Sequence, residues 1–189
     1  MTWEFIFGRF LTLLLVCQLG LILWNLRVVI RPKAKLPQSN TKVSLLIPAR
    51  NEEGSIGSCL RSLINQDHQN LEIIVLDDHS TDRTQAIVES QNPKIKLISG
   101  KPIPAGWTGK NWACHQLSKQ ATGDILFFID ADAVLEPAAI TSVLHVMEAE
   151  NVDMVASLLR NQGTSISSSI LLPIVCLLYT SPSPRDLDL

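Results

Sequence analysis

Residues 43–53 have the sequence VSLLIPARNEE, in which a short apolar run is followed at once by a polar and charged segment. The apolar part, Val43 to Ile47, predicts a buried strand. Apolar residues then recur at helical spacing, and these are Ile56, Cys59, Leu60, Leu63 and Ile64. The segment therefore predicts a strand, a polar loop and a helix that packs on the strand.

The same alternation continues along the chain. Further apolar runs predict strands at Leu71 to Leu76, Ile95 to Ile98 and Ile125 to Ile129. Three more helices are predicted between and after these strands. The first runs through Ala86, Ile87 and Val88 and is capped by Ser80 or Thr81, and the second has Ala113, Leu117 and Ala121 on one face. The third is opened by Pro137 and has an apolar stripe of Ile140, Val143, Leu144 and Met147. This pattern over Lys42 to Glu150 predicts an α/β fold, a mostly parallel sheet with helices on both faces.

Polar clusters follow three of the predicted strands. They are residues 48–53, Asp77-Asp78 and Asp130-Ala131-Asp132. In parallel sheets ligands bind beyond the carboxyl ends of the strands, so these clusters should share one edge. Acidic groups gathered there would repel one another unless a cation or a hydrogen-bond donor lies among them. The clusters therefore predict a divalent cation at Asp130 and Asp132 that bridges phosphate oxygens; the alternative is that both residues only end a strand and cap a helix.

A lysine between two of these clusters is a candidate phosphate ligand. Gly106-Trp107-Thr108-Gly109-Lys110-Asn111 is not a phosphate-binding loop of the Walker type, because Asn111 replaces the Ser or Thr that binds magnesium. Lys110 nevertheless lies just before a predicted helix, whose N-terminus favours a diphosphate. The alternative is a solvated surface lysine.

Composition narrows the function classes. Hydrophobic residues make up 46% of the chain and charged residues 18%, with a formal net charge of −2, so the chain has no overall basic field for nucleic acid. The 4 cysteines show no CxxC spacing, which argues against a disulfide scaffold or a structural zinc site.

The N-terminal segment, residues 1–30, predicts a membrane anchor. Phe10 to Leu26 contains no charged residue, and Trp3 and Trp24 lie near its margins. Basic residues follow it at Arg27, Arg31, Lys33 and Lys35, which favours a main domain on the cytoplasmic side of the membrane. A cleaved signal peptide is the alternative. Residues 31–41, rich in proline and basic residues, are expected to form a linker.

The C-terminal segment raises a separate expectation. Cys176 to Asp186 resembles the translation of an adapter used in sequencing libraries. We therefore expect residues 176–189 to be an artefact and the natural sequence to depart from this one near Val175. Residues 165–175 would then begin a further apolar or membrane segment of a longer protein.

Taken in order, these motifs resemble the family 2 glycosyltransferases, whose nucleotide-sugar-binding fold is called GT-A. The matching parts are residues 43–53, residues 75–82, Gly123-Asp124 and Asp130-Ala131-Asp132, which together span Lys42 to Asp153. The resemblance implies an incomplete GT-A domain at residues 42–164. Within the family, residues 1–3, 106–110 and 153–173 are most similar to the hopanoid-biosynthesis-associated glycosyltransferase, with the glycosyltransferases of carotenoid pathways as the nearest rivals.

The resemblance also implies a role for each site residue. Ala49 and Glu52 would lie by the nucleoside, and Asp78 would hydrogen-bond the nucleobase. Lys110 would face the diphosphate and Asp130 the ribose or the metal shell. The last role is that of Asp132, which would ligate Mg²⁺ or Mn²⁺.

These roles imply an inverting transfer of a sugar from a nucleotide-diphosphate sugar to a lipid-type acceptor, a hopanoid or another isoprenoid. The general base would lie beyond Val175. Two other functions remain open. One is a sugar-phosphate nucleotidyltransferase, although the glycine-rich basic loop of that class is replaced here by Ala49-Arg50-Asn51-Glu52-Glu53. The other is a non-catalytic membrane-anchored module that binds a nucleotide or a protein partner.

Overall fold

The structure is a computed structural model that describes residues 3–28, 40–91 and 93–156. The chain divides into two compact units at Asp153, and every helix and strand named below lies in the first unit, Met1–Asp153. Most of the predicted linker 31–41 lies outside the described residues. So do the two predicted C-terminal segments, 165–175 and 176–189.

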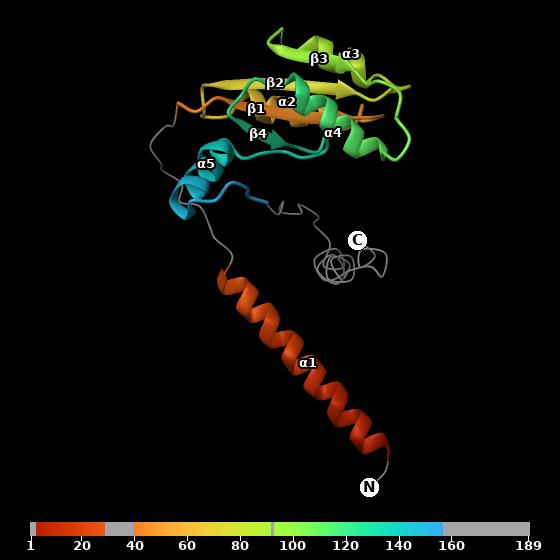
Figure 1. Cartoon of the computed structure of the whole chain (residues 1–189), viewed down its shortest axis with the longest axis vertical. Helices are drawn as coiled ribbons and strands as arrows, with labels where there is room; N and C mark the ends of the chain where they lie inside the picture. The colour runs from red at the N-terminus through yellow and green to blue at the C-terminus, as the bar shows by residue number, and fades with distance from the viewer. Residues whose placement is uncertain (1–2, 29–39, 92, 157–189) are drawn as a thin grey trace. The chain divides into compact units, whose positions relative to one another are not determined.

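The centre of the fold is a parallel sheet whose strand order is β3-β2-β1-β4 (Figure 1). Its strands are β1 (Val43–Ala49), β2 (Leu71–Asp77), β3 (Ile95–Ser99) and β4 (Ile125–Phe128). β1 lies between β2 and β4, with Val43 opposite both Leu71 and Ile125. The predicted parallel α/β sheet is confirmed, and each strand begins at the residue expected from the apolar runs.

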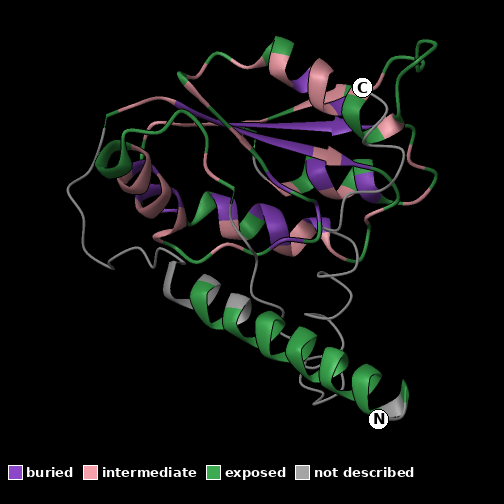
Figure 2. Cartoon of the chain, turned by 60° about the horizontal axis from the view of Figure 1, so that its bottom comes forward, coloured by how far each residue is buried: buried purple, intermediate pink, exposed green. Residues whose placement is uncertain are grey.

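Helices cover both faces of the sheet, as the sequence predicts. They are α2 (Ile56–Ile64), α3 (Thr84–Gln91), α4 (Gly109–Gln120) and α5 (Ala139–Glu150). Buried side chains of α2, α3 and α5 share one core with β1 and β2, which includes Leu60, Val88 and Ile140. On the other face, Ala113 and Leu117 of α4 pack on Leu46, Ile74 and Leu76. The buried residues are concentrated in the two central strands and the helix faces that meet them (Figure 2).

Three helix starts and one helix face differ from prediction. α4 begins at Gly109, so Lys110, which was predicted to lie just before this helix, is in its first turn. α3 begins at Thr84, so neither Ser80 nor Thr81 caps it; instead the Asp82 carboxylate accepts hydrogen bonds from the Thr84 backbone N–H and hydroxyl. α5 begins at Ala139, because Pro137 lies in the turn before it. In its predicted stripe Ile140 and Leu144 are buried, but Val143 and Met147 are only half-buried.

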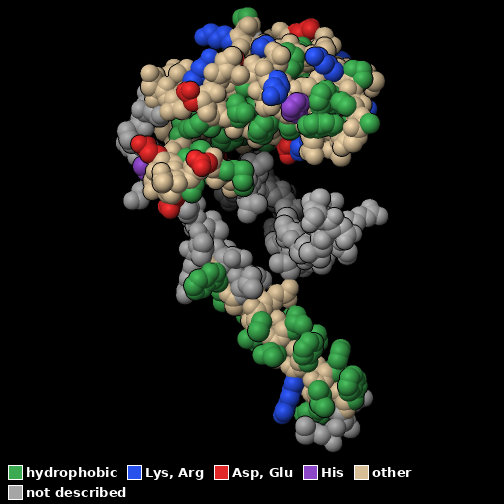
Figure 3. Space-filling view, in the orientation of Figure 1, with side chains coloured by type: hydrophobic (Ala, Val, Ile, Leu, Met, Phe, Trp, Pro, Cys, Tyr) green, Lys and Arg blue, Asp and Glu red, His purple; other side chains and the backbone are tan. Residues whose placement is uncertain are grey.

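The N-terminal segment forms one helix, α1 (Trp3–Val28). Large apolar side chains are exposed along it, as Figure 3 shows, and they include Phe7, Leu13 and Val16. Over the ranges that the structure describes, however, no helix has the length and the apolar character needed to cross a bilayer. The helical conformation is therefore as predicted, whereas the predicted transmembrane span, Phe10 to Leu26, is not supported.

Candidate functional site

The predicted site residues gather around one pocket at the carboxyl ends of β1, β2 and β4. The pocket has a volume of about 390 Å³. It is lined by Pro48, Ala49, Arg50, Glu52, Asp78, Gly109, Lys110, Ala113, Asp130, Ala131 and Asp132. All six residues assigned to a ligand from the sequence are therefore neighbours in space.

Strand register explains why these residues meet. Ala49 pairs with Asp77 at the ends of β1 and β2, and the Asp78 backbone N–H donates to the Ala49 carbonyl at 2.8 Å. On the other side of β1, the Ile129 N–H donates to the Leu46 carbonyl at 3.0 Å and brings the residues after β4 to the same edge. Three segments far apart in sequence thus end side by side.

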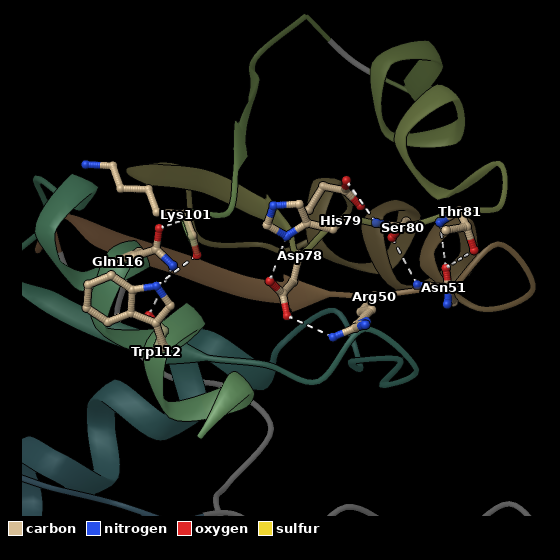
Figure 4. Close-up of polar contacts among 10 residues, drawn as sticks. Arg50, Asn51, Asp78, His79, Ser80, Thr81, Lys101, Trp112 and Gln116 are labelled. Atoms are coloured by element: carbon tan, nitrogen blue, oxygen red, sulfur yellow. Dashed lines mark hydrogen bonds and ion pairs between the residues drawn. The ribbon is translucent and has the colours of Figure 1, made fainter. Parts of the chain in front are cut away.

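Asp78 is the most enclosed carboxylate of the pocket. Its residue is only 9% exposed, and one of its carboxylate oxygens lies 3.7 Å from Arg50 Nη1 and the other 3.3 Å from His79 Nδ1 (Figure 4). Gly100, just after β3, packs closely on Asp78, since a Cβ atom there would lie 3.0 Å from the Asp78 carboxylate. Asp78 is therefore a fixed acceptor at the β2 end of the pocket.

The loop after β1 is held by the loop after β2. Asn51 adopts a left-handed conformation with φ of 55°, and its side-chain oxygen accepts a hydrogen bond from the Thr81 N–H at 2.8 Å. The Asn51 N–H donates to Ser80 Oγ at 3.0 Å, and the Glu52 N–H donates to Thr84 Oγ1 at 2.8 Å. Figure 4 shows Asn51 facing Ser80 and Thr81. These contacts fix the backbone that carries Glu52 into the pocket.

A lysine and a carboxylate pair across the pocket. Lys110 Nζ in the first turn of α4 donates to Asp130 Oδ1 at 2.7 Å. This hydrogen bond raises the pKa of Lys110, with partial burial acting against it, so the ammonium stays charged. Both side chains are more than half exposed, which means that solvent and incoming ligands can reach them. Asp132, two residues on, is also exposed.

A buried cysteine donates a hydrogen bond to the backbone of Asp130. The Cys59 thiol of α2 donates to the Asp130 carbonyl at 3.8 Å, and the Ala133 N–H donates to the same oxygen at 3.0 Å. Burial, and then the nearby charges of Asp132 and Asp130, raise the pKa of Cys59 to about 12. The thiol therefore keeps its proton and remains a hydrogen-bond donor. Sequence reasoning missed this role, because Cys59 carries only the signal of a core residue.

The donor set fits a divalent cation that is shared with a phosphate ligand. Among the described residues there is no group of three or more His, Cys, Asp and Glu side chains placed to hold a metal ion. Mg²⁺ usually keeps several waters and binds one or two carboxylates together with substrate phosphates. Asp130 and Asp132 supply that pair of carboxylates, and Lys110 already places one cationic group against Asp130.

An aromatic cluster that was not predicted from the sequence lies in and just before the first half of α4, the helix that carries Lys110. Trp107, Trp112 and His115 have ring centroids 5.0 to 5.5 Å apart. Trp112 Nε1 donates to the Lys101 carbonyl, and the Lys101 N–H donates to Gln116 Oε1 (Figure 4). These bonds tie the segment after β3 to α4. The helical spacing of Trp112 and His115 was the available signal, but the contribution of Trp107 depends on how its loop folds.

Comparisons with known proteins agree with this geometry. The sequence model of the family described as "Glycosyl transferase family 2" matches residues 44–168. A curated relative, 4,4'-diaponeurosporenoate glycosyltransferase of Staphylococcus haemolyticus, is 34% identical over 117 residues, which cover 61% of this chain and 31% of the relative. The chain thus corresponds to about a third of that relative's length.

Solved structures with a similar fold include two that contain nucleotide sugars. S. aureus TarS 1-349 in complex with UDP-GlcNAc has 28% identity and a TM-score of 0.50, over 66% of this chain and 38% of that one. Mannosyltransferase PcManGT from Pyrobaculum calidifontis, in complex with GDP-Man and Mn²⁺, has 25% identity and a TM-score of 0.53, over 67% and 39%. The predicted GT-A-like α/β fold is confirmed by these neighbours.

Proposed function

Because the chain belongs to glycosyl transferase family 2, we propose that its pocket binds the nucleotide part of a nucleotide-diphosphate sugar and that the whole protein transfers the sugar to an acceptor. One observation carries this proposal. Asp78, Lys110, Asp130 and Asp132 come from three separate segments and line the same pocket at the carboxyl edge of a parallel sheet.

The pocket offers a suitable group for each part of the donor. Ala49 and Glu52 flank the nucleoside, and Asp78 accepts a hydrogen bond from the nucleobase. Lys110 faces the diphosphate, next to backbone N–H groups at the start of α4 that the Thr108 side chain leaves uncapped. Asp130 contacts the ribose or the metal shell. Asp132 would ligate Mg²⁺ or Mn²⁺, the latter being the ion named with the P. calidifontis mannosyltransferase.

The chemistry follows from the charge on the leaving group. A bound divalent cation would supply electrostatic stabilisation of the departing diphosphate. Lys110 adds a fixed positive charge in the same place, where preorganised electrostatics contributes most to the rate. An acceptor hydroxyl attacks the anomeric carbon in line and inverts it, and its proton passes to a carboxylate general base that we expect beyond Val175.

The acceptor and the location belong to the same proposal. We propose a lipid-type acceptor, a hopanoid or another isoprenoid, and a site of action at the bacterial cytoplasmic membrane with the pocket in the cytoplasm. The supporting observations are a relative named for 4,4'-diaponeurosporenoate and the exposed apolar side chains along α1. The hopanoid assignment rests on sequence resemblance alone.

Titration of the full chain with a UDP sugar and a GDP sugar, with and without Mg²⁺, tests the donor site. We expect metal-dependent binding of one of them. Asp132→Ala should remove the metal dependence, whereas Asp153→Ala, which removes an exposed carboxylate near the end of the first unit, should leave it unchanged.

Two outcomes would contradict the proposal in different ways. Binding that is unchanged in Asp132→Ala would refute the metal assignment while leaving the nucleotide pocket in place. No binding of either donor would favour the alternative function, a non-catalytic module that recognises a partner.

A further inference from the structure

The ion pair between Lys110 and Asp130 joins two groups that the proposed function uses separately. Lys110 lies in the first turn of α4, and Asp130 follows β4, yet their charged atoms are 2.7 Å apart. Their side chains are 66% and 54% exposed. An exposed pair of this kind contributes little to stability, typically about 0–1 kcal/mol, so it can exchange partners readily.

The backbones on both sides of this pair are fixed. The Asp130 carbonyl is held by Cys59 and by the Ala133 N–H, as described above. α4 is anchored through Ala113 and Leu117, which are buried against the sheet. Only the two side chains therefore have to move when the pair opens.

Asp130 cannot bind Lys110 and a metal ion at full strength at the same time. A carboxylate oxygen that already accepts an ammonium hydrogen bond has less capacity for a second cation, and an ammonium group beside Mg²⁺ or Mn²⁺ is repelled by it. In the part of the chain that the structure describes, Asp132 makes no ion pair. The metal would therefore meet one unpaired carboxylate and one that is already neutralised.

We propose that Lys110 acts as the cation of Asp130 in the free protein and that the divalent metal and Lys110 exchange places when the donor binds. The diphosphate attracts Lys110 and leaves Asp130 to the metal. With the metal at Asp130, Lys110 would be free to face the diphosphate. This inference rests on the proposed function for the identity of the ligands, and it predicts that metal and nucleotide each strengthen the binding of the other.

The first test measures Mn²⁺ binding alone. The free aqueous Mn²⁺ signal in electron paramagnetic resonance is followed as Mn²⁺ is added to the full chain, to Lys110→Met and to Lys101→Met. The control removes the same charge from an exposed lysine whose described contacts are made by its backbone. We expect Lys110→Met to bind Mn²⁺ about two- to fivefold more tightly than the full chain, and Lys101→Met to bind it equally.

The second test adds UDP. In the unaltered chain UDP should tighten Mn²⁺ binding, and in Lys110→Met this increase in Mn²⁺ affinity should be smaller. Without metal, UDP should bind Lys110→Met more weakly than it binds the unaltered chain. Circular dichroism establishes that each variant is folded.

Three results separate the possible failures. If Lys110→Met binds Mn²⁺ no more tightly than Lys101→Met, the exchange is refuted, even if UDP and Mn²⁺ bind together. If the gain from UDP is the same in Lys110→Met as in the unaltered chain, it is also refuted. If UDP binds to none of the proteins, the proposed function fails instead, and the Mn²⁺ titration alone still decides whether Lys110 competes for Asp130.

Discussion

Gly123 shows how one residue can depend on close contact. It precedes β4, and a Cβ atom at this position would lie 2.7 Å from the Ser44 N and Oγ atoms and 2.9 Å from the Lys42 carbonyl. These atoms belong to β1 and to the residue before it, so they have little freedom to move. We expect Gly123→Ala to lower the free energy of unfolding by about 1–3 kcal/mol, measured by urea denaturation. Gly54→Ala, where a Cβ atom meets nothing within 4 Å, is the control and should change stability little.

Glu72 gives the second prediction at this scale, a pH dependence of stability. Its carboxylate accepts hydrogen bonds from Ser44 Oγ at 2.6 Å and from the Thr122 N–H at 2.9 Å. Partial burial opposes the charge, but these hydrogen bonds and the nearby Lys42 prevail and lower the pKa of Glu72 from its usual 4.5. A lowered pKa in the folded state contributes stability above the unfolded value, and this contribution is lost as the pH falls through the folded value.

We therefore expect the unaltered chain to be more stable than Glu72→Gln at pH 7, and the difference to disappear as the pH falls below 4.5. Urea denaturation at a series of pH values measures it. A difference that stays constant with pH would mean that the carboxylate charge is not what Ser44 and Thr122 recognise.

At the scale of single residues, the sequence predicted which residues line the pocket better than it predicted the contacts that hold them in place. Asp78, Asp130 and Asp132 follow strands, and parallel strands bring such residues to one edge, so their meeting could be anticipated. The hydrogen bond from Cys59 to Asp130 joins residues 71 positions apart and has no pattern in the sequence. The same holds for the pairing of Lys110 with Asp130, which depends on where α4 begins.

Between elements, Asn51 connects the loop after β1 to the loop after β2. Its left-handed backbone and its side-chain acceptor for the Thr81 N–H are separate contributions. Asn51→Gly keeps the backbone conformation and loses the acceptor, which should cost about 1 kcal/mol. Asn51→Ala loses both and should cost about 1–2 kcal/mol more. Chemical denaturation measures both values, and equal losses in the two variants would show that the left-handed conformation adds nothing.

The starts of the strands, which lie in apolar runs, were predicted well, whereas the starts of helices that lie in polar segments were predicted less well. All four strands begin where the apolar runs begin, because burial against helices decides those positions. The start of α3 was misplaced because several hydroxyl and carboxyl residues could cap it. The choice of Asp82 follows from tertiary contacts, since its other carboxylate oxygen also accepts the Glu53 N–H at 3.1 Å.

For the molecule as a whole, we expect the stability of the fold in the absence of nucleotide not to depend on a bound metal ion. The buried core residues are apolar side chains between Val43 and Leu144, and no metal cage was found among the described residues. EDTA should therefore leave the thermal midpoint of the free chain unchanged. With UDP and Mg²⁺ present the midpoint should rise, by an amount that corresponds to about 2.7 kcal/mol when the ligand is at about 100 times its Kd, and EDTA should abolish that rise.

A lower midpoint with EDTA in the absence of nucleotide would contradict this separation. It would indicate that a metal ion binds the folded chain and stabilises it without nucleotide. Differential scanning fluorimetry with a metal-free buffer as the reference measures both conditions.

The order of the strands is the part of the global fold that the sequence left undetermined. Alternating strands and helices imply a parallel sheet, but they do not say on which side of β1 each later strand is added. The structure adds β2 and β3 on one side and β4 on the other. This reversal at β1 opens the crevice in which the pocket lies. The N-terminal helix was predicted as well, whereas its passage through a membrane found no support.

The two tryptophans near the start of α4 should also give the protein a distinct optical signal. The indole rings of Trp107 and Trp112 are 5.2 Å apart, close enough to share their electronic excitation. In the sequence, the two tryptophans flank Gly109 and Lys110. Trp3 and Trp24 are separated along α1 by roughly 30 Å and do not couple to each other in this way. The coupled pair should add two adjacent bands of opposite sign to the far-ultraviolet circular dichroism spectrum. A ligand that changes the distance or the angle between the two rings would change these bands, so the protein carries its own optical probe near the start of α4 without any added label.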